Sequence, residues 1–364
     1  MKITVYVPCH DNEKTVGQTL ESIQRQVRPA DQVLFIDDHC TDQSPAIARS
    51  LGARVVELTE GRGLAAGRNC ALCNASGDVV LGVDADVVLE PPYLLELERR
   101  WNAEPEIAAI GGRLDEKFTD TPADLWRAVH MPQHHGNKEL FNPRLLFGAT
   151  MACRVEPVRR IGGWNEKFQT NHEDLDISNR LKEAGFKLLY LPACRALHLR
   201  RDTPESVLRG IWKWNEAAFA PHRASMPAWL AEGLPTIWRI YRVFRVMDLK
   251  FPGLTPVTMR MPWEWMVRDL HVMGGAGMET GEIRDLIPLA RGVIESYGGA
   301  AVTPSLCSRL QSLIDELEDG VSAGGRLLPE IVSAVQWQAL EGMPDGNYWH
   351  KCEPMLHRDA ETPR

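Results

Sequence analysis

Two aspartates, Asp84 and Asp86, follow directly after the apolar run 79–83. Such a run predicts a buried strand, and at its end both carboxylates can approach one hard cation that stays partly hydrated. A diphosphate leaving group needs this kind of cation. As a sugar–phosphate bond breaks, Mg2+ or Mn2+ stabilises the negative charge that grows on the phosphate oxygens. Two acids after a strand are also typical of a solvated turn, so the pair alone leaves both interpretations open.

A second acidic group, which includes Glu173, Asp174 and Asp176, begins the helix that we predict over 171–181. The helix dipole alone favours one or two acids at a helix start. Glycosyl transfer by direct displacement, however, needs a base that takes the proton from the acceptor hydroxyl, and a carboxylate can do this. We take Asp174 as the candidate base and Glu173 as a second catalytic candidate. A glycosidase with two carboxylates is the alternative, although it needs neither nucleotide nor metal.

A third run, 61–69, has glycines that open a predicted helix and arginines, among them Arg68, that can reach a phosphate or hold an acid. Its glycine spacing is not that of a dinucleotide-binding loop, and it does not follow the first predicted strand. Close packing at a helix start is the alternative explanation for the small residues.

The composition is that of a folded protein that binds small molecules. The 364 residues are 44% hydrophobic and 25% charged, which is enough apolar material for a large core. A formal net charge of -8 argues against nucleic acid as a partner. No apolar run approaches the roughly 18 to 20 residues of a membrane span, and residues 1–8 are too strand-like for a signal peptide. We therefore expect a cytoplasmic protein.

The first 200 residues alternate between strand and helix patterns, which predicts an α/β fold with a doubly wound, mostly parallel sheet. In such a sheet, ligands bind at the carboxyl ends of the strands. Residues 8–13, 37–38 and 84–86 each follow a predicted strand, so their polar side chains should meet at one rim. The predicted strands cover 3–7, 32–36, 54–58 and 79–83, and the predicted helices cover 16–27, 42–51 and 64–75.

After about residue 203 the strand patterns nearly vanish. We expect a catalytic domain at 1–203, a helical C-terminal domain at 204–345 that binds the acceptor or a partner, and a polar tail at 346–364. In the helical domain, arginines recur in steps of three residues at 239, 242 and 245. Such a stripe can seat a protein peripherally on anionic lipid head groups at the inner face of a membrane. An ordinary solvated helix face is the alternative.

In their order along the chain, these motifs resemble the family 2 glycosyltransferases. The resemblance covers roughly residues 1–200 and implies a GT-A fold and inverting transfer from a nucleotide-diphosphate sugar. Each motif is common by itself, whereas the ordered set is specific. The motifs occupy residues 7–13, 33–42, 63–69, 83–86, 162–168, 173–176 and 180–181.

The resemblance also implies roles for single residues. Asp86 would bind Mn2+ or Mg2+, and Asp174 would be the base. His198 follows a predicted strand where such enzymes often have a further metal ligand, although a core histidine is the alternative. The remaining implied residues would contact the donor: Pro8, Glu13, Asp38, Gly63, Arg68 and Asp84.

The acceptor is the least defined partner. Gly148, Ala149 and Trp164 lie in segments where the resembled enzymes bind acceptors, but tight packing is the alternative for the small residues. A lipid-linked glycan, a protein side chain and a small molecule all remain open as acceptors.

Two departures from the family pattern stand out. His39 and Cys40 replace the common Gly-Ser after the acids of the second strand, and the Gln-x-x-Arg-Trp element of processive synthases is missing, which favours transfer of single sugars. A catalytically silent nucleotide-sugar-binding protein is the main rival interpretation. A sugar nucleotidyltransferase is a weaker one, because residues 8–12 are not the Gly-rich arginine loop that such enzymes have.

Overall fold

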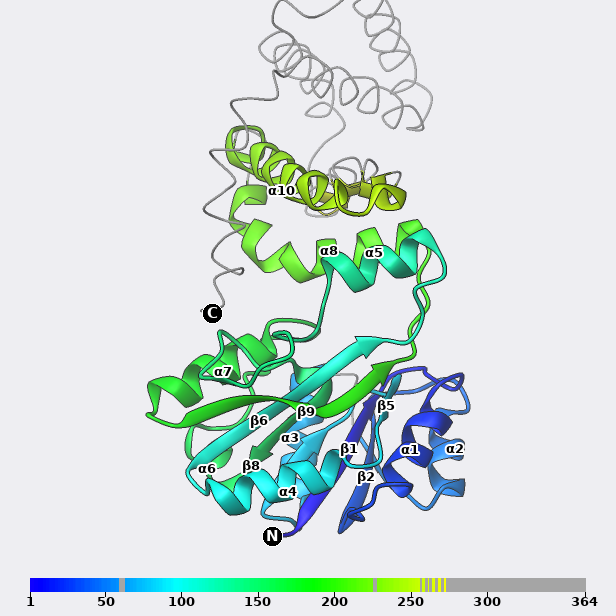
Figure 1. The fold of residues 1–364 in the computed structure, drawn as a ribbon, viewed down its shortest axis with the longest axis vertical. Coiled ribbons are helices and arrows are strands. Elements are labelled where there is room, and N and C mark those ends of the chain that lie inside the picture. The colour runs from blue at the N-terminus through cyan, green and yellow to red at the C-terminus, as the bar shows by residue number, and fades with distance from the viewer. Residues whose placement is uncertain are drawn as a thin grey trace, which may run out of the picture. The chain divides into compact units, whose positions relative to one another are not determined.

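A computed structural model describes residues 1–58, 63–224 and 228–255, and then single residues or pairs up to 272. The chain divides into two compact units, Met1–Thr203 and Pro204–Arg364 (Figure 1). The expected polar tail at 346–364 lies outside the described residues.

The first unit is built on one mixed sheet with the strand order β3-β2-β1-β4-β8-β6-β9-β5 (Figure 1). One half of this sheet is parallel and comes from the first 82 residues. The strong β-branched and aliphatic content of these strands favours burial on both faces. The parallel strands are β1 (Ile3–Cys9), β2 (Gln32–Asp37), β3 (Arg54–Glu57) and β4 (Val79–Gly82).

The other half of the sheet mixes parallel and antiparallel pairs. β8 (Met151–Arg154) runs antiparallel to both β4 and β6 (Ile107–Glu116), and β9 (Lys187–His198) runs parallel to β6. β5 (Val87–Leu89) and β7 (Leu140–Phe141) each pair with β9 in the antiparallel sense. Because β8 is reversed, the residues that precede it lie at the carboxyl edge of β4.

Helices cover both faces of the sheet, and each face has its own hydrophobic core. Val5 and Val7 belong to one core, which α1 and α4 cover, whereas Tyr6 belongs to the other, which α3, α6 and α7 cover. This alternation is the period of two that a strand imposes on its side chains. The helices are α1 (Val16–Gln24), α2 (Ser44–Ser50), α3 (Leu64–Asn74), α4 (Tyr93–Ala103), α5 (Pro122–His130), α6 (Val155–Arg160) and α7 (Glu173–Glu183).

The strands and helices predicted for residues 3–83 are confirmed, with small differences at their ends. The largest difference is at α1, which ends at Gln24 instead of residue 27. Val27 continues the apolar spacing of the helix in the sequence, yet its side chain is exposed. The backbone N–H of Val27 donates a hydrogen bond to the carbonyl of Pro91 at 2.9 Å. This tertiary contact overrides the helical spacing of the sequence.

The described part of the second unit is helical, as predicted. Its longest elements are α8 (Pro204–Phe219) and α10 (Leu234–Asp248). The buried carboxylate of Asp269 accepts hydrogen bonds from the indoles of Trp212 at 2.8 Å and Trp229 at 3.1 Å, and from Arg223 at 3.0 Å. These tryptophans are therefore core residues.

No helix in the described part of the chain is long and apolar enough to cross a membrane. The arginine stripe at 239, 242 and 245 lies on α10. Peripheral lipid contact through this stripe stays a prediction.

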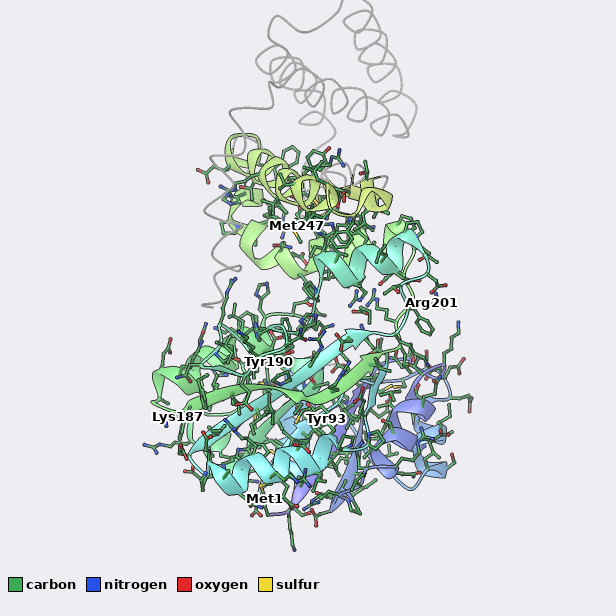
Figure 2. The ribbon with its side chains drawn as sticks, in the orientation of Figure 1. Met1, Tyr93, Lys187, Tyr190, Arg201 and Met247 are labelled. Atoms are coloured by element: carbon green, nitrogen blue, oxygen red, sulfur yellow. The ribbon has the colours of Figure 1, made fainter. Side chains whose placement is uncertain are left out.

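Gly112, in the middle of β6, tests how tightly the sheet packs. A Cβ atom at this position would overlap the hydroxyl of Tyr93, which is labelled in Figure 2, and would lie 2.6 Å from the carbonyl oxygen of Cys194. We expect Gly112→Ala to cost about 1–3 kcal/mol of unfolding free energy. For a unit of this size, that lowers the Tm by about 2–4 °C per kcal/mol. The measurement is thermal unfolding of the full chain by circular dichroism.

Gly17→Ala is the matched control, because a Cβ there meets only a methyl carbon of Ile47 at 3.7 Å. A Gly112→Ala protein that is as stable as the Gly17→Ala protein would show that this part of the sheet is loosely packed.

Candidate functional site

The sheet itself brings the first group of candidate residues together. Asp86 precedes β5, His198 is the last residue of β9, and Glu116 is the last residue of β6. The register pairs His198 with Glu116 on one side and with Val87 on the other. The backbone N–H of Leu199 also binds the carbonyl of Asp86 at 2.7 Å. Three strand ends thus converge on the His198 ring.

The two nitrogens of His198 each face a carboxylate. Nε2 lies 3.2 Å from Oδ2 of Asp86, and Nδ1 lies 3.0 Å from Oε2 of Glu116. Burial by itself would lower the pKa of His198, but the charge and hydrogen bonds of the two carboxylates outweigh it and raise that pKa to about 9. Conversely, burial would raise the pKa of Asp86, but the charges of His198, Arg200 and Arg127 hold it below its usual value.

This arrangement fits a divalent cation. Neighbouring ligands of an octahedral Mg2+, bound at about 2.0–2.1 Å, stand about 3 Å apart. The separation between Asp86 Oδ2 and His198 Nε2 is 3.2 Å. Histidines that bind metals usually donate their other N–H to a carboxylate, which is where Glu116 lies. The Asp86 side chain also keeps 26% of its surface exposed, so a cation can approach it from solvent.

Arg68, on α3, organises the second group of acids. Its side chain is 2% exposed, and it donates to the hydroxyl of Tyr6 at 3.2 Å and to Oε1 of Glu173 at 3.4 Å. The same guanidinium lies 3.7 Å from Oδ1 of Asp84. The room for it depends on a glycine in β4, since a Cβ at Gly82 would lie 2.7 Å from Nη1. Arg68 is therefore placed to hold acids.

Burial changes the proton affinity of both acids beside Arg68. Desolvation raises the pKa of Glu173 to about 7, because it outweighs the opposing charge of Arg68 and is reinforced by Asp174. Desolvation raises the pKa of Asp84 as well, with a further contribution from Asp86. Glu173 is buried against Arg68, so its place in the structure suits positioning better than proton transfer with an acceptor.

Asp174 is the more accessible acid of this helix start. The left-handed residue His172, with φ of 69°, precedes the first turn of α7. Oδ2 of Asp174 accepts from the backbone N–H of Gly148 at 3.3 Å, while the carbonyl of the next residue, Ala149, accepts from the N–H of Asp84 at 3.2 Å. One short turn, Gly148–Thr150, therefore holds both acids at the same rim.

The residues predicted near the acceptor have packing roles in the described structure. Gly148 and Ala149 are buried, and a Cβ at Gly148 would lie 2.6 Å from Nη2 of Arg68. Trp164 is 4% exposed and belongs to the core that α3, α6 and α7 cover. Its backbone pairs with the side chain of Asn69 at 2.8 and 2.9 Å, and contact between Trp164 and an acceptor stays a prediction.

The remaining residues that we predict to contact the sugar donor hold the loops of the rim. Asp38 accepts from the N–H of Gly63 at 3.1 Å, and the exposed Glu13 accepts from the N–H of Gln43 at the start of α2, also at 3.1 Å. Pro8 lies in β1. His39 adopts φ of 60°, a conformation that glycine reaches freely. The replacement of glycine by His39 therefore keeps a left-handed turn.

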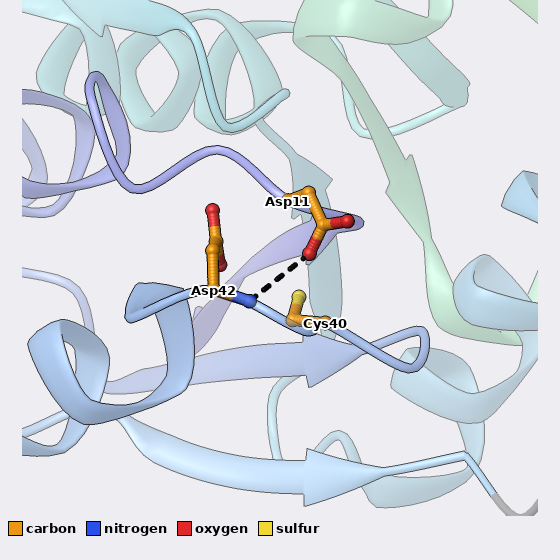
Figure 3. Close-up of side chains that lie close together, drawn as sticks. All are labelled: Asp11, Cys40 and Asp42. Atoms are coloured by element: carbon orange, nitrogen blue, oxygen red, sulfur yellow. Dashed lines mark hydrogen bonds between the residues drawn. The ribbon is translucent and has the colours of Figure 1, made fainter.

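A second set of possible ligand atoms belongs to Asp11, Cys40 and Asp42, which lie within 4.8 Å of one another (Figure 3). Asp11 already accepts from the backbone N–H groups of Thr41 at 2.6 Å and Asp42 at 3.2 Å. Burial raises the pKa of the Cys40 thiol, which keeps it protonated and a poor ligand. These contacts tie the loops after β1 and β2 together, so the cluster is a weaker cation site than Asp86 and His198.

Sequence reasoning missed Glu116, Arg127 and Asp202. The three are buried and linked, since Arg127 lies 3.0 Å from Glu116 and 3.4 Å from Asp202. The apolar run 107–110 was a usable strand signal, and the rule that ligands lie at strand ends would then have pointed to Glu116. No local pattern marks the other two.

Residues 4–162 match the sequence model of Glycosyl transferase family 2. These residues form a glycosyl transferase family 2 domain. The match ends before α7 and β9, so the part of the rim that holds Asp174 and His198 lies beyond it.

Among curated proteins, the family 2 domain is similar to the pre-mycofactocin glycosyltransferase of Mycobacterium tuberculosis, with 26% identity over 208 residues that cover 55% of this chain and 43% of that protein. It is also similar to the probable glycosyltransferase YdaM of Bacillus subtilis, with 22% identity over 234 residues that cover 58% and 54%. The chain thus spans about half the length of the curated relatives it matches.

Among solved structures, the mannosyltransferase PcManGT from Pyrobaculum calidifontis, in complex with GDP-Man and Mn2+, is similar over 94% of this chain and 88% of that one, with a TM-score of 0.50 and 16% identity. This likeness shows the fold, which is that of the GT-A glycosyltransferases.

The raised pKa of Glu173 predicts a pH dependence of stability. The folded protein holds this proton up to about pH 7, whereas the unfolded chain releases it near the ordinary value of 4.5. Between these values unfolding releases a proton, so the free energy of unfolding should fall as pH rises. Glu173→Gln should remove that part of the slope, measured as urea midpoints across this pH range.

Glu98→Gln is the control, because Glu98, on α4, pairs with Arg28 outside this cluster. Equal slopes in the wild type and the Glu173→Gln protein would mean that Glu173 ionises in the folded state as it does in the unfolded chain.

Proposed function

We propose that this chain is an inverting glycosyltransferase that moves a sugar from a nucleoside-diphosphate donor to an acceptor hydroxyl. The observation that carries the proposal is the meeting of two kinds of site at one rim of a family 2 domain. Asp86 and His198 offer ligands 3.2 Å apart for a cation, and the turn that binds Asp84 also binds the accessible Asp174.

Each side chain has a part in a single displacement. Asp174 accepts the proton of the acceptor hydroxyl as the acceptor oxygen forms a bond to the anomeric carbon of the donor sugar. The bond between that carbon and the phosphate oxygen breaks from the opposite side, and the electron pair leaves with the nucleoside diphosphate. Asp86 and His198 would hold a Mg2+ or Mn2+ ion, which stabilises the charge on the leaving group.

The rest of the rim places these groups. Arg68 lies against both Asp84 and Glu173, and the Asp84 side chain, which is 34% exposed, can face the sugar and ribose of the donor. Glu13 and Asp38 stay our candidates for the nucleotide pocket, since both brace loops at the ends of β1 and β2. The curated relatives are named glycosyltransferases, and the similar mannosyltransferase was solved with GDP-Man and Mn2+, which supports a nucleotide sugar and a divalent cation.

We place catalysis in residues 1–203 and the binding of the acceptor or of a partner in the helical region 204–345. A cytoplasmic enzyme that meets the inner face of a membrane through α10 fits the arginine stripe.

Asp174→Asn tests the base directly. The amide keeps the size of the side chain and can still accept from Gly148, but it cannot take a proton. We expect turnover with donor, acceptor and Mn2+ to fall by about 10²–10⁴-fold, while donor binding is retained. The measurement is release of nucleoside diphosphate from a panel of nucleotide sugars and acceptors, beside donor binding by calorimetry.

Asp176→Asn is the matched control, because Asp176 sits in the same helical turn but pairs with Arg180 at 2.6 Å. It should turn over like the wild type. If Asp174→Asn keeps full activity, Asp174 is not the base. If the wild type binds a donor but transfers sugar to no acceptor, the silent binding protein is the better interpretation.

A further inference from the structure

A series of buried ion pairs lies next to the proposed cation ligands, and the proposed function gives these ion pairs no role. Glu116, at the end of β6, is 6% exposed and lies against Nδ1 of His198 at 3.0 and 3.1 Å. Arg127, on α5, donates to Glu116 at 3.0 Å and to Asp202 at 3.4 Å. Asp202 also forms an ion pair with Arg200 at 3.1 Å. Both residues lie on the segment after β9, where Arg201 is labelled in Figure 2.

We propose that Glu116, held by Arg127, is a positioning residue that fixes the tautomer of His198 and so keeps its Nε2 open to a divalent cation. This inference rests on the proposed function, because it takes Asp86 and His198 as the cation ligands.

A histidine that binds a cation is a neutral imidazole, which carries one proton. A cation binds the lone pair of a ring nitrogen, so the proton must be on the other nitrogen. At His198 two carboxylates compete for it, since Asp86 faces Nε2 at 3.2 Å and Glu116 faces Nδ1 at 3.0 Å. If the proton settled on Nε2, it would bridge to Asp86 and close the cation site.

The contacts of Glu116 favour a proton on Nδ1 over a proton on Nε2. Both of its oxygens lie within 3.1 Å of Nδ1, whereas Asp86 offers one oxygen to Nε2. Asp86 is also 26% exposed on its side chain, so water weakens its hold on the ring, and Glu116 is 6% exposed.

Arg127 keeps Glu116 in place. A buried carboxylate is costly unless it is paired, and the Nε–H of Arg127 supplies that pair from inside the core. The second contact of Arg127, to the fully buried carboxylate of Asp202, fixes the guanidinium itself. The backbone N–H of Asp202 is bound by Asp124 of α5 at 2.8 Å, so α5 and the segment after β9 brace each other. The geometry of the ring is thus set from three elements.

The experiment measures Mn2+ alone on the full-length protein, by the free Mn2+ signal in electron paramagnetic resonance. Glu116→Gln should raise the Kd for Mn2+ by about 10–100-fold, the usual effect of losing the partner of a metal-binding histidine. Arg127→Lys keeps the charge but has one nitrogen where two are used, so it should raise the Kd less. Glu98→Gln, which removes another ion-paired glutamate remote from the rim, should leave the Kd unchanged.

A spectroscopic readout separates positioning from a loss of folding. With histidine labelled by 15N, electron spin echo modulation should show one imidazole nitrogen on Mn2+ in the wild type. In the Glu116→Gln protein this nitrogen signal should be lost or weakened at saturating Mn2+, while circular dichroism shows an unchanged fold. If that variant unfolds, the Arg127→Lys protein is used for the same readout.

The outcomes separate this inference from the proposed function. If Asp86→Ala abolishes Mn2+ binding but Glu116→Gln and Arg127→Lys keep wild-type affinity and nitrogen signal, the inference is overturned and the proposed cation site stands. If Asp86→Ala binds Mn2+ like the wild type, or the wild type shows no histidine nitrogen on Mn2+, both the cation site and this inference fail.

Discussion

Negative charge is concentrated at the carboxyl edge of the central sheet, and buried cations are what allow the fold to hold it there. Two arginines and a histidine lie among the acids of this edge, each almost completely buried. Removing Arg68, for example, would leave the buried Glu173 without its cation, and a change of this kind is strongly destabilising. The acids of the edge are Asp84, Asp86, Glu116, Glu173 and Asp174, and the cations are Arg68, Arg127 and His198.

The two arginines offset the negative charge of different acids at the rim. Arg68 serves Asp84 and Glu173, whereas Arg127 serves Glu116 and, through it, the His198 ring. Neither arginine reaches Asp86 or Asp174 with a direct ion pair among the contacts of the described residues. The proposed chemistry needs Asp86 to bind a cation and Asp174 to accept a proton. The buried ion pairs therefore leave these two carboxylates available and fix the residues around them.

Much of the first half of the sheet could be predicted from the sequence, because its strands are short apolar runs that end at polar turns. That rule singled out Asp84 and Asp86, and the family resemblance supplied the roles expected of them. The second half could not be predicted in the same way. β8 is reversed, so Gly148 reaches the rim by preceding its strand, and no local pattern reveals that direction. In the sequence Arg68 could reach a phosphate or hold an acid, and tertiary packing buries it against Glu173 and Asp84.

The location of the cation is the central claim, and anomalous diffraction at the manganese edge tests it most directly. Crystals of the full chain grown with Mn2+ and a nucleoside diphosphate should show one strong peak within bonding distance of Asp86 and His198, with Glu116 on the far side of the ring. A peak beside Asp11 and Asp42 instead, with none at Asp86, would contradict the account.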